Sequence, residues 1–123
     1  MFTTINVPSD SVHFEHLKHL KLSGIDFTMD PSFDYLTLRV PVLKKFEICN
    51  CKWSSGKDII VDASLLESIS IQQDFNELQG QSIKFNEHAN LRHLEIGLVT
   101  NIEVILDLLQ KSPVLKTLVL TLK

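Results

Sequence analysis

Cysteine is scarce in this sequence of 123 residues, and its two cysteines, Cys49 and Cys51, stand two positions apart. In an extended strand both side chains project from the same face, and this spacing does not give the geometry of an ordinary disulfide. A disulfide-held scaffold is therefore excluded, and a reducing compartment is expected. The sequence also lacks an Asn-x-Ser/Thr glycosylation acceptor. Both features favour the cytoplasm or the nucleus.

Excess basic charge and long apolar runs are lacking as well. The net charge is -3 and the isoelectric point is near 5.9, so there is no basic footprint that would neutralise phosphates, and we expect no nucleic-acid partner. No apolar run approaches the roughly 20 residues of a membrane-spanning helix. The first twenty residues have neither a basic start nor a continuous apolar core, so we expect no secretory signal and no membrane partner.

The sequence contains few groupings that suggest a cofactor, metal or catalytic site. Its four glycines are well separated, which argues against a glycine-rich phosphate loop. His16 and His19 are three positions apart, but they precede a predicted strand and no second ligand cluster accompanies them, as a zinc site would require. The other histidines, His13, His88 and His93, are scattered singly. We expect surface histidines, no metal, no cofactor and no enzymatic activity.

What the sequence does contain is a recurring apolar pattern, L-x-x-L-x-L. First members of successive copies are 26, 23, 25 and 24 residues apart, within the range of leucine-rich repeats. A partial copy, Phe2/Ile5/Val7, begins 15 residues before the first full copy. We therefore expect one domain over residues 1–123, with about five regular repeats and a partial N-terminal one. The five copies are Leu17/Leu20/Leu22, Leu43/Phe46/Ile48, Leu66/Ile69/Ile71, Leu91/Leu94/Ile96 and Leu115/Leu118/Leu120.

Each copy predicts a short strand whose alternate residues point inward, and stacked copies would join these strands into a parallel sheet over one continuous core. Unrelated strands of a sandwich or barrel would need turn signals about every 8–12 residues, and the period here is twice that. The expected fold is an α/β leucine-rich-repeat solenoid. It would be an RNI-like arc with a parallel sheet on its concave face and mixed helices and extended segments on its convex face.

The segments between these strands are expected to differ from one another. Asp30 as N-cap, Pro31 in the first turn, and Phe33, Leu36 and Val40 on one face predict a helix. The segment from Lys52 to Ser64 has no helical period, so we expect an extended return with a short strand on the outer face. We expect Trp53 to be an outer-layer packing residue that covers the edge of the core. A further extended stretch is expected at Ile83-Lys84-Phe85.

A second helix is expected over Asn101–Lys111. Thr100 and Glu103 form a T-x-x-E capping box at its start. Ser112-Pro113 ends it, because the residue before a proline is biased away from helical geometry. The buried stripe would be Ile102, Ile105, Leu106 and Leu109.

In order and spacing, the motifs resemble the leucine-rich-repeat region of plant F-box proteins of the F-box/LRR and FBD type. In that family a P-x-L-x-x-L-x-I-x-x-C-x-W segment leads through an extended stretch to an S-x-L-x-S-L-x-I segment, and the resemblance runs from about Ile5 to Leu120. The matching positions are Pro41, Leu43, Phe46, Ile48, Cys51 and Trp53; Ser64, Leu66, Ser68, Ile69 and Ile71; and Asn90, Leu91, Leu94, Leu109, Ser112, Pro113, Leu115 and Leu118.

The resemblance implies a protein–protein recognition module, the part of an F-box subunit that selects a substrate protein for a cullin-RING ubiquitin ligase. The F-box, which docks to the ligase adaptor, has no counterpart here, and neither does the FBD segment. We therefore expect a repeat domain truncated at both ends, with adaptor binding only where a longer form carries an F-box. The identity of the substrate protein does not follow from the sequence.

In the expected strands, the residues that alternate with the inward leucines would form a ladder across the sheet. We interpret this ladder as a partner-binding face, although each residue taken singly also suits a solvated sheet surface with cross-strand charge neighbours. The ladder consists of His19, Lys21, Lys45, Glu47, Ser68, Ser70, His93, Glu95, Thr117 and Val119.

The two cysteines leave one alternative function open. Cys51 stands at the cysteine position of the repeat consensus, where a buried thiol can satisfy the turn backbone. Cys49 would project on the ladder side as a free thiol. A hydrolase that uses either cysteine with a histidine would also need a base and an oxyanion site that the sequence does not indicate. A fragment without independent function is the other alternative, suggested by the uncovered end strands.

Overall fold

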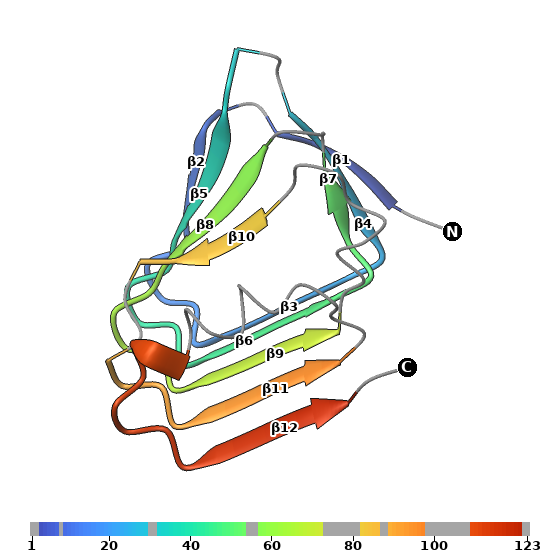
Figure 1. Ribbon diagram of the computed structural model, residues 1–123. Coiled ribbons are helices and arrows are strands. Elements are labelled where there is room, and N and C mark those ends of the chain that lie inside the picture. The colour runs from blue at the N-terminus through green and yellow to red at the C-terminus, as the bar shows by residue number, and fades with distance from the viewer. Residues whose placement is uncertain are drawn as a thin grey trace.

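The computed structural model describes residues 3–7, 9–29, 32–53, 57–72, 82–86, 89–97 and 109–121. Through these residues the chain forms a coil whose sides are three sheets, each made of parallel strands (Figure 1). A complete turn of the coil contributes one strand to each sheet. One such turn consists of β4 (Ile25–Met29), β5 (Tyr35–Arg39) and β6 (Lys45–Cys49). The predicted solenoid with a parallel sheet is confirmed.

The three sheets enclose the core as the sides of a triangle (Figure 1). The five-stranded sheet has the order β12 (Thr117–Thr121), β11 (His93–Gly97), β9 (Ser68–Gln72), β6 and β3 (His19–Ser23). The four-stranded sheet has the order β10 (Ser82–Phe85), β8 (Asp58–Asp62), β5 and β2 (Ser11–His13). The three-stranded sheet has the order β1 (Thr3–Val7), β4 and β7 (Lys52–Trp53).

The register of the five-stranded sheet confirms the alignment of the five apolar copies. Equivalent residues of neighbouring strands lie side by side, so the second and third members of the copies form two continuous rows. The first row is Leu20, Phe46, Ile69, Leu94 and Leu118, and the second is Leu22, Ile48, Ile71, Ile96 and Leu120.

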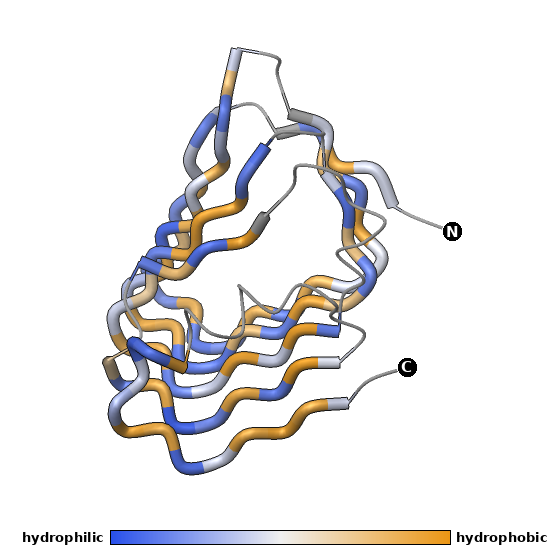
Figure 2. The backbone as a smooth tube through the Cα atoms, in the orientation of Figure 1, coloured by the Kyte–Doolittle hydropathy of each residue, from blue (hydrophilic) through white to orange (hydrophobic). Residues whose placement is uncertain are grey.

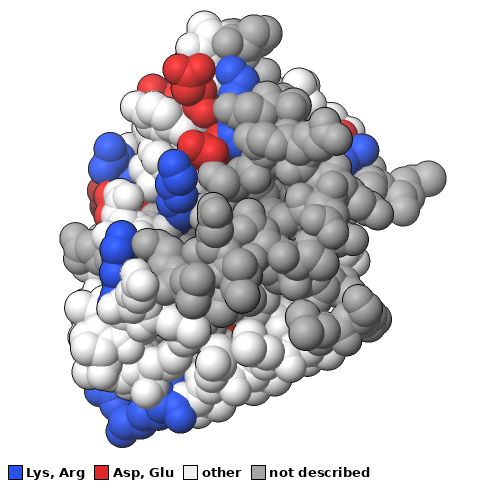
Figure 3. All heavy atoms as spheres, in the orientation of Figure 1, with Lys and Arg blue, Asp and Glu red and all other residues white. Residues whose placement is uncertain are grey.

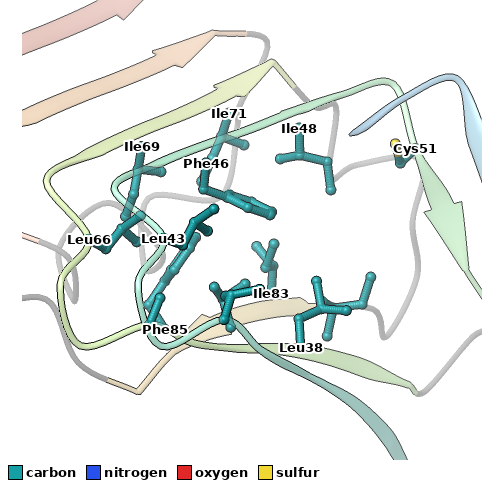
Figure 4. Close-up of a cluster of buried hydrophobic side chains, with 14 of the residues drawn as sticks. Leu38, Leu43, Phe46, Ile48, Cys51, Leu66, Ile69, Ile71, Ile83 and Phe85 are labelled. Atoms are coloured by element: carbon teal, nitrogen blue, oxygen red, sulfur yellow. The ribbon is translucent and has the colours of Figure 1, made fainter. Parts of the chain in front are cut away.

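The core lies between the inner faces of the sheets. Hydropathy alternates along the strands, as a period of two residues requires (Figure 2). Phe46 is fully buried, and its ring meets that of Phe85 edge to face, with centroids 5.7 Å apart and an interplanar angle of 77°. Figure 4 shows Ile69 and Ile71 of the five-stranded sheet on the opposite side of this ring from Ile83 of the four-stranded sheet. The two sheets therefore share one apolar interior.

A recurring turn leads the chain into the five-stranded sheet. In each case a backbone N–H donates to the carbonyl three residues earlier, and Pro41 and Pro113 occupy the second position, where their fixed φ favours the turn. The first residue of each turn is buried and its carbonyl oxygen accepts the bond. The three N–H···O bonds run from Leu43 to Val40 (3.0 Å), from Leu66 to Ala63 (3.3 Å) and from Leu115 to Ser112 (3.2 Å).

A different corner leads out of the five-stranded sheet. Gly24 after β3 and Asn50 after β6 both have positive φ, 65° and 49°. Glycine adopts this left-handed conformation without steric cost, and asparagine tolerates it better than most residues. The backbone N–H of Gly24 donates to Cys49 O, and that of Asn50 donates to Gln72 O. These two residues therefore turn the chain while remaining bonded to the next coil.

The helix predicted from Asp30 to Val40 is wrong for its described part, because Tyr35–Arg39 is strand β5. Asp30 and Pro31 lie outside the described residues. Leu36 and Val40 are four apart and so fit a helix face, but with the buried Leu38 they also fit the alternation of a strand. Parallel pairing of β5 with β2 and with β8 accounts for the extended form.

The other expected returns have mixed outcomes. The extended return from Lys52 to Ser64 is confirmed by β7 and β8, and the stretch at Ile83-Lys84-Phe85 is confirmed by β10. Trp53 is buried, and its indole Nε1–H donates to Lys57 O at 2.9 Å. Most of the helix expected over Asn101–Lys111, including its capping box, lies outside the described residues; Leu109 and Gln110 are helical.

The partial N-terminal copy belongs to a different sheet from the five regular ones. Its members Ile5 and Val7 lie in β1 and pair with Phe27 and Met29 of β4, in the three-stranded sheet. Among the described residues, no helix is long and apolar enough to span a membrane.

Replacement of Asn50 provides a test of the corner geometry. Asn50→Ala should lower the free energy of unfolding by about 1 kcal/mol, because a side chain with a plain Cβ is strained in the left-handed region. Asn50→Gly should be close to neutral. Denaturant unfolding followed by circular dichroism measures both changes, and equal stabilities of the two variants would contradict a left-handed corner at this position.

Candidate functional site

The outward face of the five-stranded sheet carries all of the predicted ladder. Because side chains alternate along each strand, the residues that stand between the buried ones point away from the core. The pairing places them in two rows across the five strands. One row is His19, Lys45, Ser68, His93 and Thr117, and the other is Lys21, Glu47, Ser70, Glu95 and Val119.

Contacts between side chains organise one end of this face. The imidazole Nε2–H of His19 donates to Glu47 Oε2 at 2.7 Å. The Lys45 ammonium lies 4.0 Å from the other oxygen, Glu47 Oε1. Glu47 therefore contacts one group from the neighbouring strand β3 and one from its own strand β6. Its side chain is 24% exposed, whereas those of His19 and Lys45 are about half exposed at 52% and 50%.

The middle of the face is more enclosed. Ser70 is buried, and its hydroxyl donates to Glu95 Oε2 at 3.3 Å. His93, Glu95 and Ser68 are half-buried. The environment therefore changes across the face: exposed basic groups lie near β3, and a hydrogen-bonded hydroxyl and carboxylate join β9 to β11.

The pKa of Glu47 is lowered from its ordinary value of 4.5, chiefly by the hydrogen bond from His19. Partial burial opposes this shift, and the nearby charges of Lys45, His19 and Lys21 reinforce it. Since the carboxylate form is favoured by folding, its contribution to stability is present above pH 4.5 and is lost as the pH falls through the lower pKa of the folded state. Glu47 is therefore a carboxylate at neutral pH.

A second cluster of polar residues, which the sequence analysis did not predict, lies on the outer side of the four-stranded sheet. His13, Arg39 and Asp62 lie side by side on β2, β5 and β8. The Arg39 guanidinium donates from Nη1 to Asp62 Oδ2 at 3.1 Å. A shallow cavity of about 260 Å³ lies over this row, lined by these residues together with Glu15, Pro41 and Ser64.

A signal for this row was present in the sequence spacing. From His13 to Arg39 is 26 residues and from Arg39 to Asp62 is 23, the same steps that separate the first three apolar copies. Other charged neighbours on this sheet are also paired, as with Lys84 Nζ and Asp58 Oδ2 at 3.4 Å. Figure 3 shows acidic and basic side chains close together on this side of the molecule. Its charges are therefore largely balanced in place.

The two cysteines have different environments. Cys51 is buried at 2% exposure, and its thiol donates to Cys49 O at 3.5 Å. Burial raises its pKa, although backbone hydrogen bonds oppose the shift. A raised pKa disfavours the thiolate that a nucleophile requires, and the burial of Cys51 with its thiol on a backbone carbonyl agrees with the structural position expected for it. Cys49 is half-buried on the outward side of β6.

Three of the five histidines lie outside the ladder. His13 and His16 are exposed, and His88 lies outside the described residues. In the part of the chain that the structure describes, no cluster of three or more His, Cys, Asp or Glu side chains has a geometry that could hold a metal ion.

Comparisons with known proteins do not identify a family or a function for this chain. No protein-family model, no curated protein and no solved structure matches the chain. The ladder's role as a partner-binding surface stays a prediction.

Removal of the His19 imidazole should raise the pKa of Glu47. In His19→Ala the largest cause of the lowered pKa is lost, so the Glu47 carboxyl should titrate closer to 4.5. Carbon-detected NMR of the side-chain carboxyl measures this titration. His93→Ala, on the same row but distant from Glu47, is the matched control and should leave the titration unchanged; an identical Glu47 titration in both variants would contradict the hydrogen bond as its cause.

The two thiols should react at different rates with an aromatic disulfide reagent. Cys49 should react first in the folded protein, because Cys51 is buried and its pKa is raised. Absorbance of the released thiolate gives the rates. Cys49→Ser should remove the fast phase and Cys51→Ser should retain it, whereas the opposite pattern would show that Cys51 is the accessible thiol.

Proposed function

We propose that the outward face of the five-stranded sheet binds a partner protein, and that the chain acts by recognition and not by catalysis. The observation that carries this proposal is the register of the sheet, which gathers the predicted ladder residues into two adjacent rows on one surface. Neighbouring strands are spaced about 4.8 Å apart, so five strands span about 19 Å. This width suits contact with a protein surface.

Rigidity of the backbone supports this proposal. On the opposite side of the same strands, Phe46, Ile69 and Leu94 are fully buried. A side chain on such a strand has little backbone freedom left to lose on binding, which lowers the entropic cost of association. Outward side chains are therefore presented in a fixed order.

The charges on the face support selectivity. Lys21 and Lys45 lie near Glu47, whose negative charge is held by His19. A partner must meet both signs in the right order, and a like charge placed opposite either group is penalised. Hydroxyls on Ser68 and Thr117 extend the polar surface toward β12.

The resemblance to plant F-box/LRR proteins gives this recognition a proposed setting. In that setting the bound protein is the substrate of a cullin-RING ubiquitin ligase, and the ligase adaptor contacts an F-box supplied by a longer form. The face would contribute by positioning the substrate, because the ubiquitin-transfer chemistry belongs to other subunits. Binding by the face is separable from ligase recruitment and can be tested first.

Charge reversal on the face tests the recognition proposal. The double variant Lys21→Glu/Lys45→Glu should reduce capture of a specific partner at least ~10-fold, because it reverses the charge at two outward positions of the sheet. The matched control is Lys52→Glu/Lys84→Glu, which makes the same change in net charge on the other two sheets. Quantitative mass spectrometry after cross-linking in cells measures the capture.

The expected result is a protein captured by the wild type and by the control but lost from the face variant. Thermal unfolding of all three proteins by circular dichroism establishes that the variants are folded. Equal capture of every partner by the face variant and the wild type would contradict recognition by this surface. Equal losses in both double variants would show that net charge, and not the face, governs binding.

A further inference from the structure

The strand β12 leaves apolar side chains uncovered at one end of the solenoid. Leu118 and Leu120 are 41% and 50% exposed. Their counterparts in the neighbouring strand, Leu94 and Ile96, are buried. In the described structure β12 is the outermost strand of its sheet, so this exposure follows from its position and not from a change in the apolar pattern.

The opposite end of the same sheet has an apolar hollow. Beside the edge strand β3 lies a cavity of about 210 Å³. Phe14 at its rim is 44% exposed, and Ile5 is 41% exposed. Leu20 and Leu22 of β3 form part of its wall. The lining is otherwise apolar apart from Asn6, and its remaining members are Val12, Phe27, Leu36 and Leu38.

The apolar residues at the two ends occupy equivalent positions of the repeat, so β3 of one molecule could follow β12 of another as the next strand. Leu118 and Leu120 stand in the same two rows as Leu20 and Leu22. If β3 of a second copy followed β12 in register, Leu118 would lie beside Leu20 of that copy and Leu120 beside its Leu22. The new neighbours would repeat the contact that each inner strand already makes with the next.

The backbone at the strand entries also continues across such a junction. At every step of the sheet, two consecutive N–H groups donate to one carbonyl of the preceding strand entry. Lys44 and Lys45 donate in this way to Lys18 O, and Lys116 and Thr117 donate to Arg92 O. One further step would join the N–H groups of Lys18 and His19 in a second copy to Lys116 O of the first.

The charges at the junction permit this contact and predict its salt dependence. The outward neighbours would be Thr117 beside His19 and Val119 beside Lys21, which brings no like charges together. Lys116 would approach Lys18, and this repulsion between exposed ammonium groups is screened by salt. Like charges already neighbour each other at the strand entries of Arg92 and Lys116.

We propose that the occupant of this edge is a second copy of the chain, bound head to tail with β12 pairing in parallel to β3 of the next copy. The contact joins two different surfaces, so each copy retains one free end and the association is open. The five-stranded sheet then continues from copy to copy, and the recognition face continues with it.

Sedimentation velocity of the 123-residue chain tests the proposal. The sedimentation coefficient should rise over a roughly 100-fold range of protein concentration, and it should rise further with added sodium chloride because the Lys116–Lys18 repulsion is screened. A single monomer coefficient at every concentration and salt level would overturn the proposal.

Variants that block one end each provide the sharper test. Leu120→Lys blocks the β12 end and Phe14→Lys blocks the β3 end, and both positions are already exposed. Leu65→Lys is the matched control, because Leu65 is 43% exposed in a turn between β8 and β9, away from both ends. It should associate like the wild type, whereas each end variant alone should weaken association at least ~10-fold.

An equimolar mixture of the two end variants decides the geometry. Each retains the end that the other lacks, so the mixture should form a dimer and no larger species. If Phe14→Lys alone associates like the wild type while Leu120→Lys does not, the contact is a symmetric one between two β12 strands and the head-to-tail proposal fails. Circular dichroism melts verify folding, and Ile5→Lys replaces Phe14→Lys if that variant is unfolded.

Discussion

In-register burial of apolar rows is the interaction on which the rest of this structure depends. A single strand of five residues cannot remove its own leucines and isoleucines from water, so each coil is stable only against its neighbours. Burial of one such side chain contributes roughly 1.5–3 kcal/mol. The rows fix the register, because a slip of one residue would turn the whole apolar set of a strand toward solvent.

The sequence predicted this sheet well because its signal is local and repeated. The spacing of three and then two residues marks the strand and its entry, and the recurrence near 24 residues identifies which strands are equivalent. The two remaining sheets were harder to predict. Leu36, Leu38 and Val40 satisfy a strand, but Leu36 and Val40 also satisfy a helix, and Asp30-Pro31 favours a helix start. Pairing with β2 and β8 is a tertiary contact that no local pattern encodes.

The candidate face could be predicted in outline but not in its contacts. Alternation along the strands identifies which side chains point outward, as for Lys45 and Glu47. The hydrogen bond from His19 to Glu47 joins residues 28 positions apart, and it depends on the register together with the rotamers of both side chains. The row of His13, Arg39 and Asp62 shows the same dependence: its spacing was visible, yet polar residues recur too often for spacing alone to single it out.

Repetition has opposite consequences for the face and for the ends of this molecule. Along the sheet, each added coil covers the apolar rows of the one before it and extends the outward ladder, so stability and the proposed recognition surface grow together. At the ends the same rows are interrupted, and Leu120 is left half exposed on β12, which pairs on one side only in the described part of the chain. A strand edge of this kind is protected in many proteins by charged residues or proline, and β12 (TLVLT) contains neither. The side chains of β12 are therefore as well suited to continuing the sheet as those of any inner strand, which makes association through this edge a consequence of the repeat itself.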